Sequence, residues 1–453
     1  MNKKEQYLAA IDIGTTKIVA IVGKKNENDK IEILGLSKAL SKGVKRGVVM
    51  NIEETVSAIQ TTVEDVQKRS GIMFSEVFVG IAGQHIKSMK NRGYIIRDNY
   101  EDEIKKEEVF KLIEDMHKIH IDIGEEIIHV IPQNFIVDNE TGVKSPIGMC
   151  GKRLEANFHI VIGQVAAAKN IEKCIRKANL SVKDMILEPL ASSDAVLTED
   201  EKEAGVVLVD IGGGTTDLAV YFDNIIRHTA VIPLGGNVVT KDIKEGCAIL
   251  QRYAEQLKIQ YGSALGDIAP EDKVVSIPGI SGREPKEISF RSLAYIIQSR
   301  MEEIIDFVNF EIQNSGYADK LAAGVVITGG GAMLKHLSQL MKFKTAMDVR
   351  IGFPNEHLAG TGRDEINQPM YATAVGLIMR GFEYIETYRK SFNADRQEVF
   401  VRPQRIDVTE KEESVINGYE EPEEFVPEPK TSITEKIKMM MSKMFEIEDQ
   451  PIN

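Results

Sequence analysis

Three glycine-rich turns carry the residue types that could bind a phosphate. They read DIGTTK (12–17), DIGGGTTD (210–217) and ITGGGAM (327–333). A Gly-rich turn between two strands can point several backbone N–H groups at one anion, because no side chain blocks the approach. Threonine hydroxyls add donors, and a lysine adds positive charge. The residues expected to bind phosphate in the first two turns are Gly14, Thr15, Thr16, Lys17, Gly212, Gly213, Gly214, Thr215 and Thr216.

An aspartate precedes each of the first two turns, at the end of an apolar run. Asp12 and Asp210 could hold a hydrated Mg²⁺, because this ion keeps several waters and takes few protein carboxylates. The third turn follows another apolar run and is expected to open a helix whose N-terminus approaches a nucleoside or phosphate. Its residues are Gly329, Gly330, Gly331 and Met333. One such turn alone is more often an ordinary tight turn, so the prediction of a nucleotide site depends on all three.

The elements that must position these turns repeat along the chain. An apolar run, the Asp-Ile-Gly turn and two further β-rich runs begin near residue 7 and again near residue 205. The runs are short, rich in Val and Ile, and bounded by turn residues, which favours strands over helices. Helical patterns follow at 51–71 and 236–249. The sequence therefore predicts an α/β fold built from a duplicated unit, with the site between the halves.

The subdomain boundaries follow from where this pattern is interrupted. Residues 84–163 combine strand-like runs with a helical stretch at 105–120, which predicts a small α+β insertion in the first half. The full set of expected bounds is 1–83, 164–200 and 365–392 for the first large subdomain, 201–235 and 306–364 for the second, and 236–305 for a second small subdomain.

Composition narrows the classes of protein. The net charge of −13, with no basic stripe in the body, argues against binding to nucleic acid. Three cysteines lie far apart, so neither a disulfide framework nor a zinc site is expected, and a reducing cytosol is the simplest compartment. The N-terminus lacks a signal-peptide core, and no apolar run reaches the ~18 residues of a membrane span. We expect an intracellular protein.

The C-terminal part of the sequence predicts a linker and a membrane-targeting helix. Residues 393–431 become acidic and proline-containing, and such a segment buries too little to offset its ordering entropy. On a helix over 432–448 the apolar residues share one face with lysines at its borders, as in helices that lie on a membrane. The expected membrane contacts are Ile433, Ile437, Met440, Met441, Met444, Phe445, Lys436, Lys438 and Lys443. Docking of this stripe on protein is the alternative.

The motifs together resemble a known superfamily. In order and separation, the three turns resemble the two phosphate motifs and the adenosine motif of the actin-like ATPases. The stretch YAEQLKIQYGSA (253–264) resembles the helix with which these proteins hold ribose and adenine, which implies that Glu255 and Lys258 contact the nucleotide. The insertion, introduced by VFVGIAGQHIKSMKNRG (77–93), is similar to the subdomain specific to the FtsA family of bacterial cell-division proteins.

This resemblance covers most of residues 5–390 and implies a function. The family's members bind ATP and Mg²⁺, polymerise, bind FtsZ and tether the Z ring to the cytoplasmic membrane, alongside other division proteins. The C-terminal peptide of FtsZ is expected to dock on residues 236–305, with Arg300 as the candidate contact. Two alternatives stay open: an actin-like scaffold of another machine, such as a PilM-type pilus-assembly factor, and a small-molecule kinase.

Two further sets of residues have competing interpretations. Glu188, in ILEPL, is the candidate for orienting a hydrolytic water, but a capping glutamate before proline fits the sequence equally, and the nucleotide could serve as a structural clamp or a switch. His117, His120 and His129 could be metal ligands. The first two lie three residues apart on a polar helical stretch, which favours a solvated face.

Overall fold

The computed structural model describes residues 6–27, 30–279, 283–354, 358–359 and 363–393. These residues belong to one unit, Met1–Asp395, whereas the second unit, Arg396–Asn453, lies outside the described residues. Nearly all of the predicted linker and the whole predicted membrane helix, with its nine expected lipid contacts, therefore lie outside them too.

The first half is built on one mixed sheet with the order β11-β6-β1-β2-β3-β19. Its strands are β1 (Tyr7–Ile13), β2 (Lys17–Lys25), β3 (Ile31–Leu40), β6 (Glu76–Ile81), β11 (Ser181–Leu187) and β19 (Leu358–Ala359). A small hairpin follows, made of β4 (Val44–Lys45) and β5 (Val48–Val49). The central strands β1 and β2 are buried almost throughout, as their unbroken apolar runs predict.

The second half repeats this sheet in the order β14-β13-β12-β17-β18. Its strands are β12 (Val206–Ile211), β13 (Thr216–Phe222), β14 (Ile225–Ile232), β17 (Gly324–Thr328) and β18 (Val349–Ile351). Strand β1 pairs antiparallel with β2 and parallel with β6, and β12 pairs in the same way with β13 and β17. Strand β12 therefore corresponds to β1, and β13 to β2. The predicted duplication of an α/β unit is confirmed.

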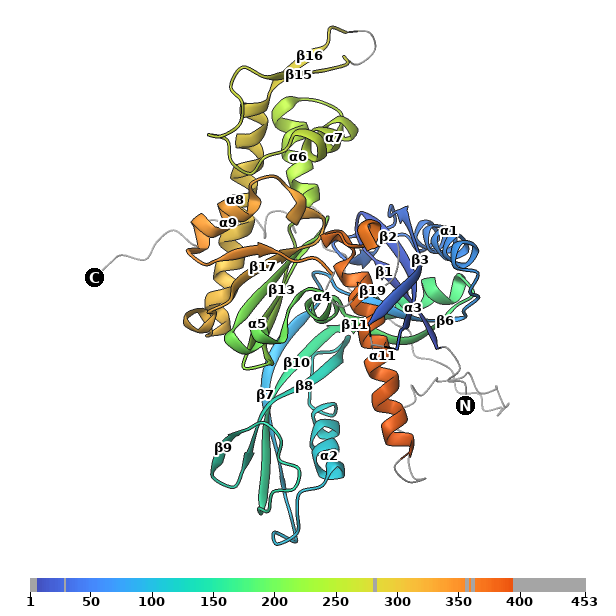
Figure 1. The fold of residues 1–453 in the computed structure, drawn as a ribbon, viewed down its shortest axis with the longest axis vertical. Helices are drawn as coiled ribbons and strands as arrows, with labels where there is room; N and C mark the ends of the chain where they lie inside the picture. Colours follow the sequence, from blue (N-terminus) through green and yellow to red (C-terminus); the bar gives the residue numbers. More distant parts are fainter. Residues whose placement is uncertain (1–5, 28–29, 280–282, 355–357, 360–362, 394–453) are drawn as a thin grey trace, which may run out of the picture. The chain divides into compact units, whose positions relative to one another are not determined.

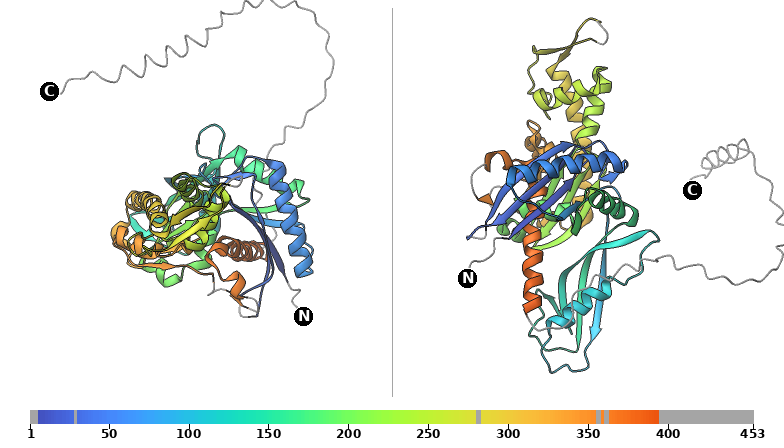
Figure 2. Two further views of the ribbon diagram at one scale, coloured as in Figure 1. Left: turned by 90° about the horizontal axis from the view of Figure 1, so that it is seen from above. Right: turned by 90° about the vertical axis from the view of Figure 1, so that its right-hand side faces the viewer.

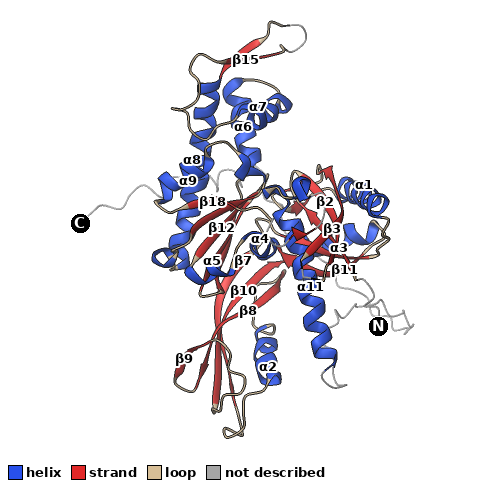
Figure 3. Ribbon diagram, in the orientation of Figure 1, coloured by secondary structure: helices blue, strands red, loops and turns tan. Residues whose placement is uncertain are grey.

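Helices cover and join the two sheets (Figures 1 and 3). They are α1 (Ile52–Ser70), α3 (Val165–Lys177), α4 (Glu188–Val196), α5 (Glu199–Ala204), α9 (Leu337–Thr345), α10 (Arg363–Ile366) and α11 (Ala372–Asn393). Helix α1 packs on β2 and β3, and both views of Figure 2 show this blue helix beside the blue strands. Helix α4 contacts α11 and also β12 and β13 of the second sheet. Leu208 and Ala219 of the second sheet accordingly share one hydrophobic core with the first half.

The insertion forms a sheet of its own with the order β7-β10-β8-β9. Its elements are β7 (Lys87–Ile96), α2 (Lys106–Met116), β8 (Glu125–Val137), β9 (Glu140–Val143) and β10 (Arg153–Gln164). A separate core, which includes Leu112 and Phe158, holds α2 against this sheet. The predicted helix over 105–120 is shorter than expected: it ends at Met116, so His117 is its C-terminal cap and His120 lies beyond it.

The remaining elements form the second small subdomain. They are α6 (Gly236–Cys247), α7 (Gln251–Tyr261), β15 (Val274–Ile277), β16 (Lys286–Ser289) and α8 (Phe290–Ser315). Two predicted boundaries differ from the structure. Residue 305 lies inside α8, because this helix continues its apolar face into the large subdomain. Leu358 pairs in parallel with Ile31 of the first sheet, although its segment was assigned to the second half.

Candidate functional site

The first two glycine turns meet at one pocket between the halves. Its lining residues are Asp12, Gly14, Thr15, Thr16, Lys17, Glu188, Asp210, Gly212, Gly213, Gly214, Thr215, Asp217, Gly329, Gly330, Met370 and Thr373. The approach is close: a Cβ added to Gly213 would lie 1.8 Å from Thr16 Oγ1, and one added to Gly214 would lie 2.5 Å from Thr15 Oγ1. Glycine is therefore required in the second turn for the two turns to face each other.

The strand ladders explain which side chains reach this pocket. Ile13 pairs with Ile18 across the first turn, and Ile211 pairs with Thr216 across the second. Thr216 was predicted to offer its hydroxyl to phosphate, but it is fully buried and donates to the Leu234 carbonyl at 2.9 Å. It does not line the pocket, because side chains alternate along β13 and that of Thr216 faces the interior.

The third turn touches the site with fewer of its residues than expected. Gly329 has φ of 82°, and a Cβ there would lie 2.3 Å from Asp210 Oδ1, so glycine is needed for both reasons. Gly330 also lines the pocket, whereas Gly331 abuts Ile211 and Met333 is half exposed outside the lining. The predicted helix does not begin at the glycines: Gly330–Met333 is a 3-10 turn, and α9 begins at Leu337.

Four carboxyl groups and one cation face the pocket. Burial raises the pKa of Asp217 to about 8, and the neighbouring charge of Asp210 adds to this. Burial also raises the pKa of Asp12 to about 6, against the opposing effect of Lys17. The pKa of Glu188 lies well above its ordinary value, through burial first and then the charge of Asp12.

The fourth carboxyl group, Asp210, is the most strongly hydrogen-bonded of the set. Burial raises its pKa, while a hydrogen bond from Ser192 and the charge of Lys17 oppose this change. Ser192 Oγ donates to Asp210 Oδ2 at 2.7 Å, and Thr373 Oγ1 donates to the same oxygen at 3.3 Å. Strand β12 and helices α4 and α11 thus converge on this carboxylate, which fixes its orientation.

Asp217 is a site residue that the sequence analysis missed. It ends the DIGGGTTD motif and lies directly opposite Asp210 in the β12–β13 ladder, so the two side chains share one face of the sheet. Thr215 Oγ1 donates to Asp217 Oδ2 at 3.0 Å, while Oδ1 is buried without a hydrogen-bond partner among the described residues. The hairpin register was the available signal, because it follows from the length of the turn.

The carboxylates suit a hydrated cation better than a closed metal cage. Within the part of the chain that the structure describes, no three His, Cys, Asp or Glu residues gather closely enough to ligate one ion directly. This applies to His117, His120 and His129 as well. Asp217 nevertheless has a buried oxygen without a hydrogen-bond partner among the described residues, and burial followed by the charge of Asp210 raises the pKa of this group. An ion such as Mg²⁺, which keeps several waters, fits these residues.

Glu255 and Lys258 are connected to the second turn through Gly236. On α7 they form an ion pair, and Lys258 Nζ donates to the Gly236 carbonyl at 2.9 Å and to Thr240 Oγ1 at 2.8 Å. The Gly236 N–H in turn donates to the Gly212 carbonyl at 2.9 Å. The structure thus connects α7 to the second turn, although neither charged side chain lines the pocket itself.

Arg300 occupies a different part of the second small subdomain. Its guanidinium contacts Asp242 Oδ2 on α6 at 2.5 Å and also pairs with Glu303 one turn along α8. These two carboxylates hold its pKa above the usual range. The side chain is 28% exposed, so an acidic peptide would have to compete with Asp242 for it.

Comparison with known proteins identifies the family. Over 379 residues the chain is 41% identical to the cell division protein FtsA of Pseudomonas aeruginosa, which covers 83% of this chain and 90% of the relative. It is 36% identical over 386 residues to the FtsA of Escherichia coli K12, covering 83% and 91%. The chain belongs to the FtsA family of cell division proteins. Residues 207–376 match the family described as cell division protein FtsA, and residues 83–162 match the SHS2 domain inserted in it.

Solved structures show the same fold at low identity. A PilM–PilN type IV pilus biogenesis complex aligns with a TM-score of 0.60 at 14% identity, covering 83% of this chain and 98% of that chain. MreB5 of Spiroplasma citri bound to AMPPNP aligns with a TM-score of 0.50 at 14% identity, covering 86% and 98%. The fold is therefore actin-like, with the SHS2 insertion at the predicted place. Among the helices that the structure describes, none is both long and apolar enough to cross a membrane.

Proposed function

We propose that this protein binds ATP and Mg²⁺ between its first two glycine turns and works as an adaptor of cell division. The observation that carries the nucleotide site is the meeting of both turns at one pocket that also holds Lys17 and four carboxyl groups. Backbone N–H groups of Gly14, Gly213 and Gly214 are proposed to hold the phosphates, whereas that of Gly212 donates to the Thr215 carbonyl at 2.9 Å and closes the turn. Asp12, Asp210 and Asp217 are proposed to hold the hydrated Mg²⁺, which neutralises charge between them and the phosphates.

The other predicted site residues take roles around this centre. Glu255 and Lys258 are proposed to reach the ribose and adenine, since α7 is tied to the second turn through Gly236. Glu188 is proposed to orient the water that attacks the terminal phosphate. Its carboxyl group lines the same pocket as Asp12 and Lys17, and bound Mg²⁺ would favour its charged form.

The cellular role rests on membership of the FtsA family. As an adaptor, the protein would self-associate into filaments, bind the C-terminal peptide of FtsZ on its second small subdomain, and tether the Z ring to the cytoplasmic face of the membrane. Arg300 is the proposed FtsZ contact, in exchange for part of its pairing with Asp242. The likeness to the pilus complex concerns the fold alone and does not favour a pilus scaffold.

Membrane attachment is proposed to depend on residues 432–448 and on self-association. Seven apolar side chains, the six expected contacts and Ile447 on the same helical face, would contribute roughly 5–9 kcal/mol when half buried, and each lysine near anionic lipid adds at most ~1 kcal/mol. Ordering the helix and losing rigid-body freedom remove much of this. One tail therefore holds weakly, and many tails on one filament hold firmly through avidity.

Co-sedimentation with anionic liposomes tests this proposal. The full chain, a chain ending at Lys430 and the Met440→Glu/Met441→Glu variant are compared with and without Mg²⁺ and ATP. Only the full chain should pellet, and a variant unable to self-associate should pellet severalfold less with its tail intact. If the chain ending at Lys430 pellets equally well, the membrane role of the tail is wrong.

A further inference from the structure

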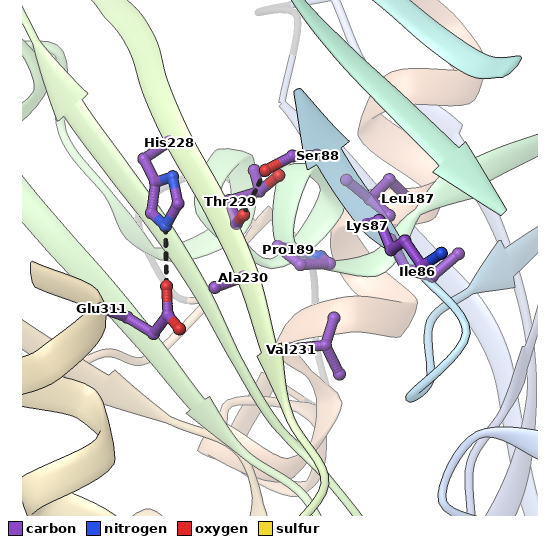
Figure 4. Close-up of a pocket in the computed structure, with 10 residues that line it drawn as sticks. All are labelled: Ile86, Lys87, Ser88, Leu187, Pro189, His228, Thr229, Ala230, Val231 and Glu311. Atoms are coloured by element: carbon purple, nitrogen blue, oxygen red, sulfur yellow. Dashed lines mark hydrogen bonds and ion pairs between the residues drawn. The ribbon is translucent and has the colours of Figure 1, made fainter. Parts of the chain in front are cut away.

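The start of helix α4 separates two cavities. The Glu188 side chain lines the nucleotide pocket, whereas its neighbours Leu187 and Pro189 line a second cavity of about 250 Å³. The other walls of this second cavity come from the insertion, from β14 and from Glu311 of α8, as Figure 4 shows. The backbone that carries Glu188 thus forms the wall between the nucleotide pocket and a cavity lined in part by the insertion.

A histidine of the insertion contacts the backbone just before Glu188. The backbone N–H of Leu187 donates to Nε2 of His129, on β8, at 3.1 Å. An Nε2 atom that accepts a hydrogen bond carries no proton, so the ring proton lies on Nδ1. The Ile186–Leu187 peptide, one residue before Glu188, is thereby tied to a side chain 58 residues earlier in the sequence.

An irregularity in the insertion sheet is associated with this contact. His129 pairs with Val161, but Ile127 pairs with Ile162, so Ile128 is an extra residue in β8. Such a bulge bends the strand and re-aims the side chains beside it. Ile128 packs against the core of the first half, and its Cδ1 lies 2.4 Å from where a Cβ of Gly163 would be. The bulge thus lies at the N-terminal end of β8, where Ile128 packs on the first half and His129 contacts Leu187.

The Glu188 side chain is confined from a second direction. A Cβ added to Gly80, on β6, would lie 3.0 Å from both Cγ and Oε1 of Glu188. Gly80 therefore leaves the space that the carboxyl group occupies. The His129 bond thus restrains the backbone just before Glu188, and Gly80 leaves room for the Glu188 side chain.

The insertion is also attached to the second half. Ser88 Oγ donates to the Thr229 carbonyl at 2.8 Å, and Gln133 Nε2 donates to the Ile226 carbonyl at 2.9 Å. Both acceptors belong to β14, the outer strand of the second sheet. The insertion therefore contacts the first half at Leu187 and the second half at β14.

From these contacts we infer that His129 is a positioning residue, through which the insertion controls the carboxyl group of Glu188 in the nucleotide pocket. A partner that moves the insertion against β14 changes the Leu187–His129 bond and with it the position of Glu188. This inference rests on the proposed function, because it needs Mg²⁺ and ATP to bind in that pocket.

A double-mutant cycle between His129 and Glu188 tests the inference. His129→Leu removes the acceptor, while His129→Gln keeps one. The dissociation constant for Mg²⁺ and ATP and the single-turnover hydrolysis rate are measured for the full chain. We expect His129→Leu to change at least one of these by about fivefold, and His129→Gln to restore most of the loss. In the Glu188→Gln background, His129→Leu should change neither by more than about twofold, because the group on which it acts is gone.

Two further variants separate positioning from general loosening of the insertion. Gln133→Leu breaks a buried contact with β14 but leaves the Leu187–His129 bond, so it should couple to Glu188→Gln much less than His129→Leu does. Gly80→Ala displaces Glu188 directly and should reproduce the effect of His129→Leu without adding to it. Near-ultraviolet circular dichroism and chemical unfolding of each variant confirm that it is folded.

The outcomes distinguish the two proposals. If the unaltered chain does not bind Mg²⁺ and ATP, the proposed function fails. If it binds them, and the effect of His129→Leu is the same in both Glu188 backgrounds or is matched by Gln133→Leu, the positioning role of His129 is wrong.

Discussion

The first two glycine turns close hairpins of the same register but carry different charges. Asp12 and Asp210 occupy matching places at the ends of β1 and β12. Seven residues later the first hairpin carries Val19 and the second carries Asp217, each directly opposite its aspartate. The place held by Thr215 in the second turn is held by Lys17 in the first.

This difference shows how two similar halves can contribute different chemical groups to one site. The first turn contributes the cation, whereas the second contributes two carboxyl groups and the glycines that let the turns approach. Phosphate needs positive charge and open backbone N–H groups, while a metal ion needs carboxylates. Each half alone lacks part of the set, so the site forms only where the two turns meet.

The largest effect is expected from the glycines of the second turn. Gly213→Ala places a methyl group 1.8 Å from Thr16 Oγ1 and forces the turns apart. Overpacking of this kind costs up to ~3 kcal/mol, so affinity for ATP should fall about 100-fold. Gly246→Ala, on α6 outside the pocket lining, is the control, because its Cβ would meet only the Ile296 side chain. Calorimetric titration with ATP measures both, and equal losses would contradict the facing of the turns.

Removing the cation of the first turn should have the next largest effect. Lys17 is the one Lys or Arg among the described residues that line the pocket. Lys17→Thr gives the first turn the residue type of the second, and the loss of a charged contact should weaken ATP binding roughly 10–100-fold. Adding Thr215→Lys tests whether the turns are interchangeable. We expect no rescue, because a lysine there would pair with Asp217; restored affinity would show that only total charge matters.

The extra carboxyl group of the second turn predicts a pH dependence of stability. Because the pKa of Asp217 in the folded protein is about 8, against an ordinary value of 3.8, the folded state holds a proton that the unfolded state releases between these values. Without nucleotide, the contribution of Asp217 to the free energy of unfolding is therefore present at low pH and lost as pH rises toward about 8. Asp217→Asn, which stays neutral, should gain on the order of a few °C in Tm relative to the unaltered chain between about pH 5 and about pH 8.

Differential scanning fluorimetry without nucleotide measures this change. Asp223→Asn is a control at a half-exposed aspartate in the turn after β13, and it should leave the Tm profile unchanged. Asp12, with a pKa of about 6, should show the same trend over a narrower range of pH. A difference between Asp217→Asn and the unaltered chain that does not vary with pH would refute the raised pKa.

The smallest effect is expected from helix α7, which is tied to the second turn through Gly236. Lys258→Met removes the donors to the Gly236 carbonyl and to Thr240, so the second turn loses one support. ATP affinity should fall about two- to fivefold, the worth of one hydrogen bond. Lys241→Met, at an exposed Lys–Glu pair on α6, is the matched control and should bind ATP normally. Equal affinities in a fluorescent-nucleotide titration would exclude α7 from the site.

Local patterns were enough to predict most elements of the two halves. Short apolar runs with turn residues give β1, β2, β12 and β13, and their equal spacing in the two halves gives the duplication. Asn51 and Gly71 bound α1 as N-cap and left-handed C-cap, because both act within one turn of the helix. These features depend on neighbours in the sequence, so the sequence by itself determined them, together with the three glycine turns.

What only the tertiary structure decided depends on segments far apart in the chain. The pKa of Glu188 follows from burial beside Asp12, Asp210 and Asp217, which come from β1, β12 and β13. The hydroxyl of Thr216 turns inward to Leu234, which no turn motif reveals. The contact between His129 and Leu187 needs the insertion to fold back on the first half. Burial and long-range hydrogen bonds arise only when the sheets assemble, because they join groups that have no fixed separation in the unfolded chain.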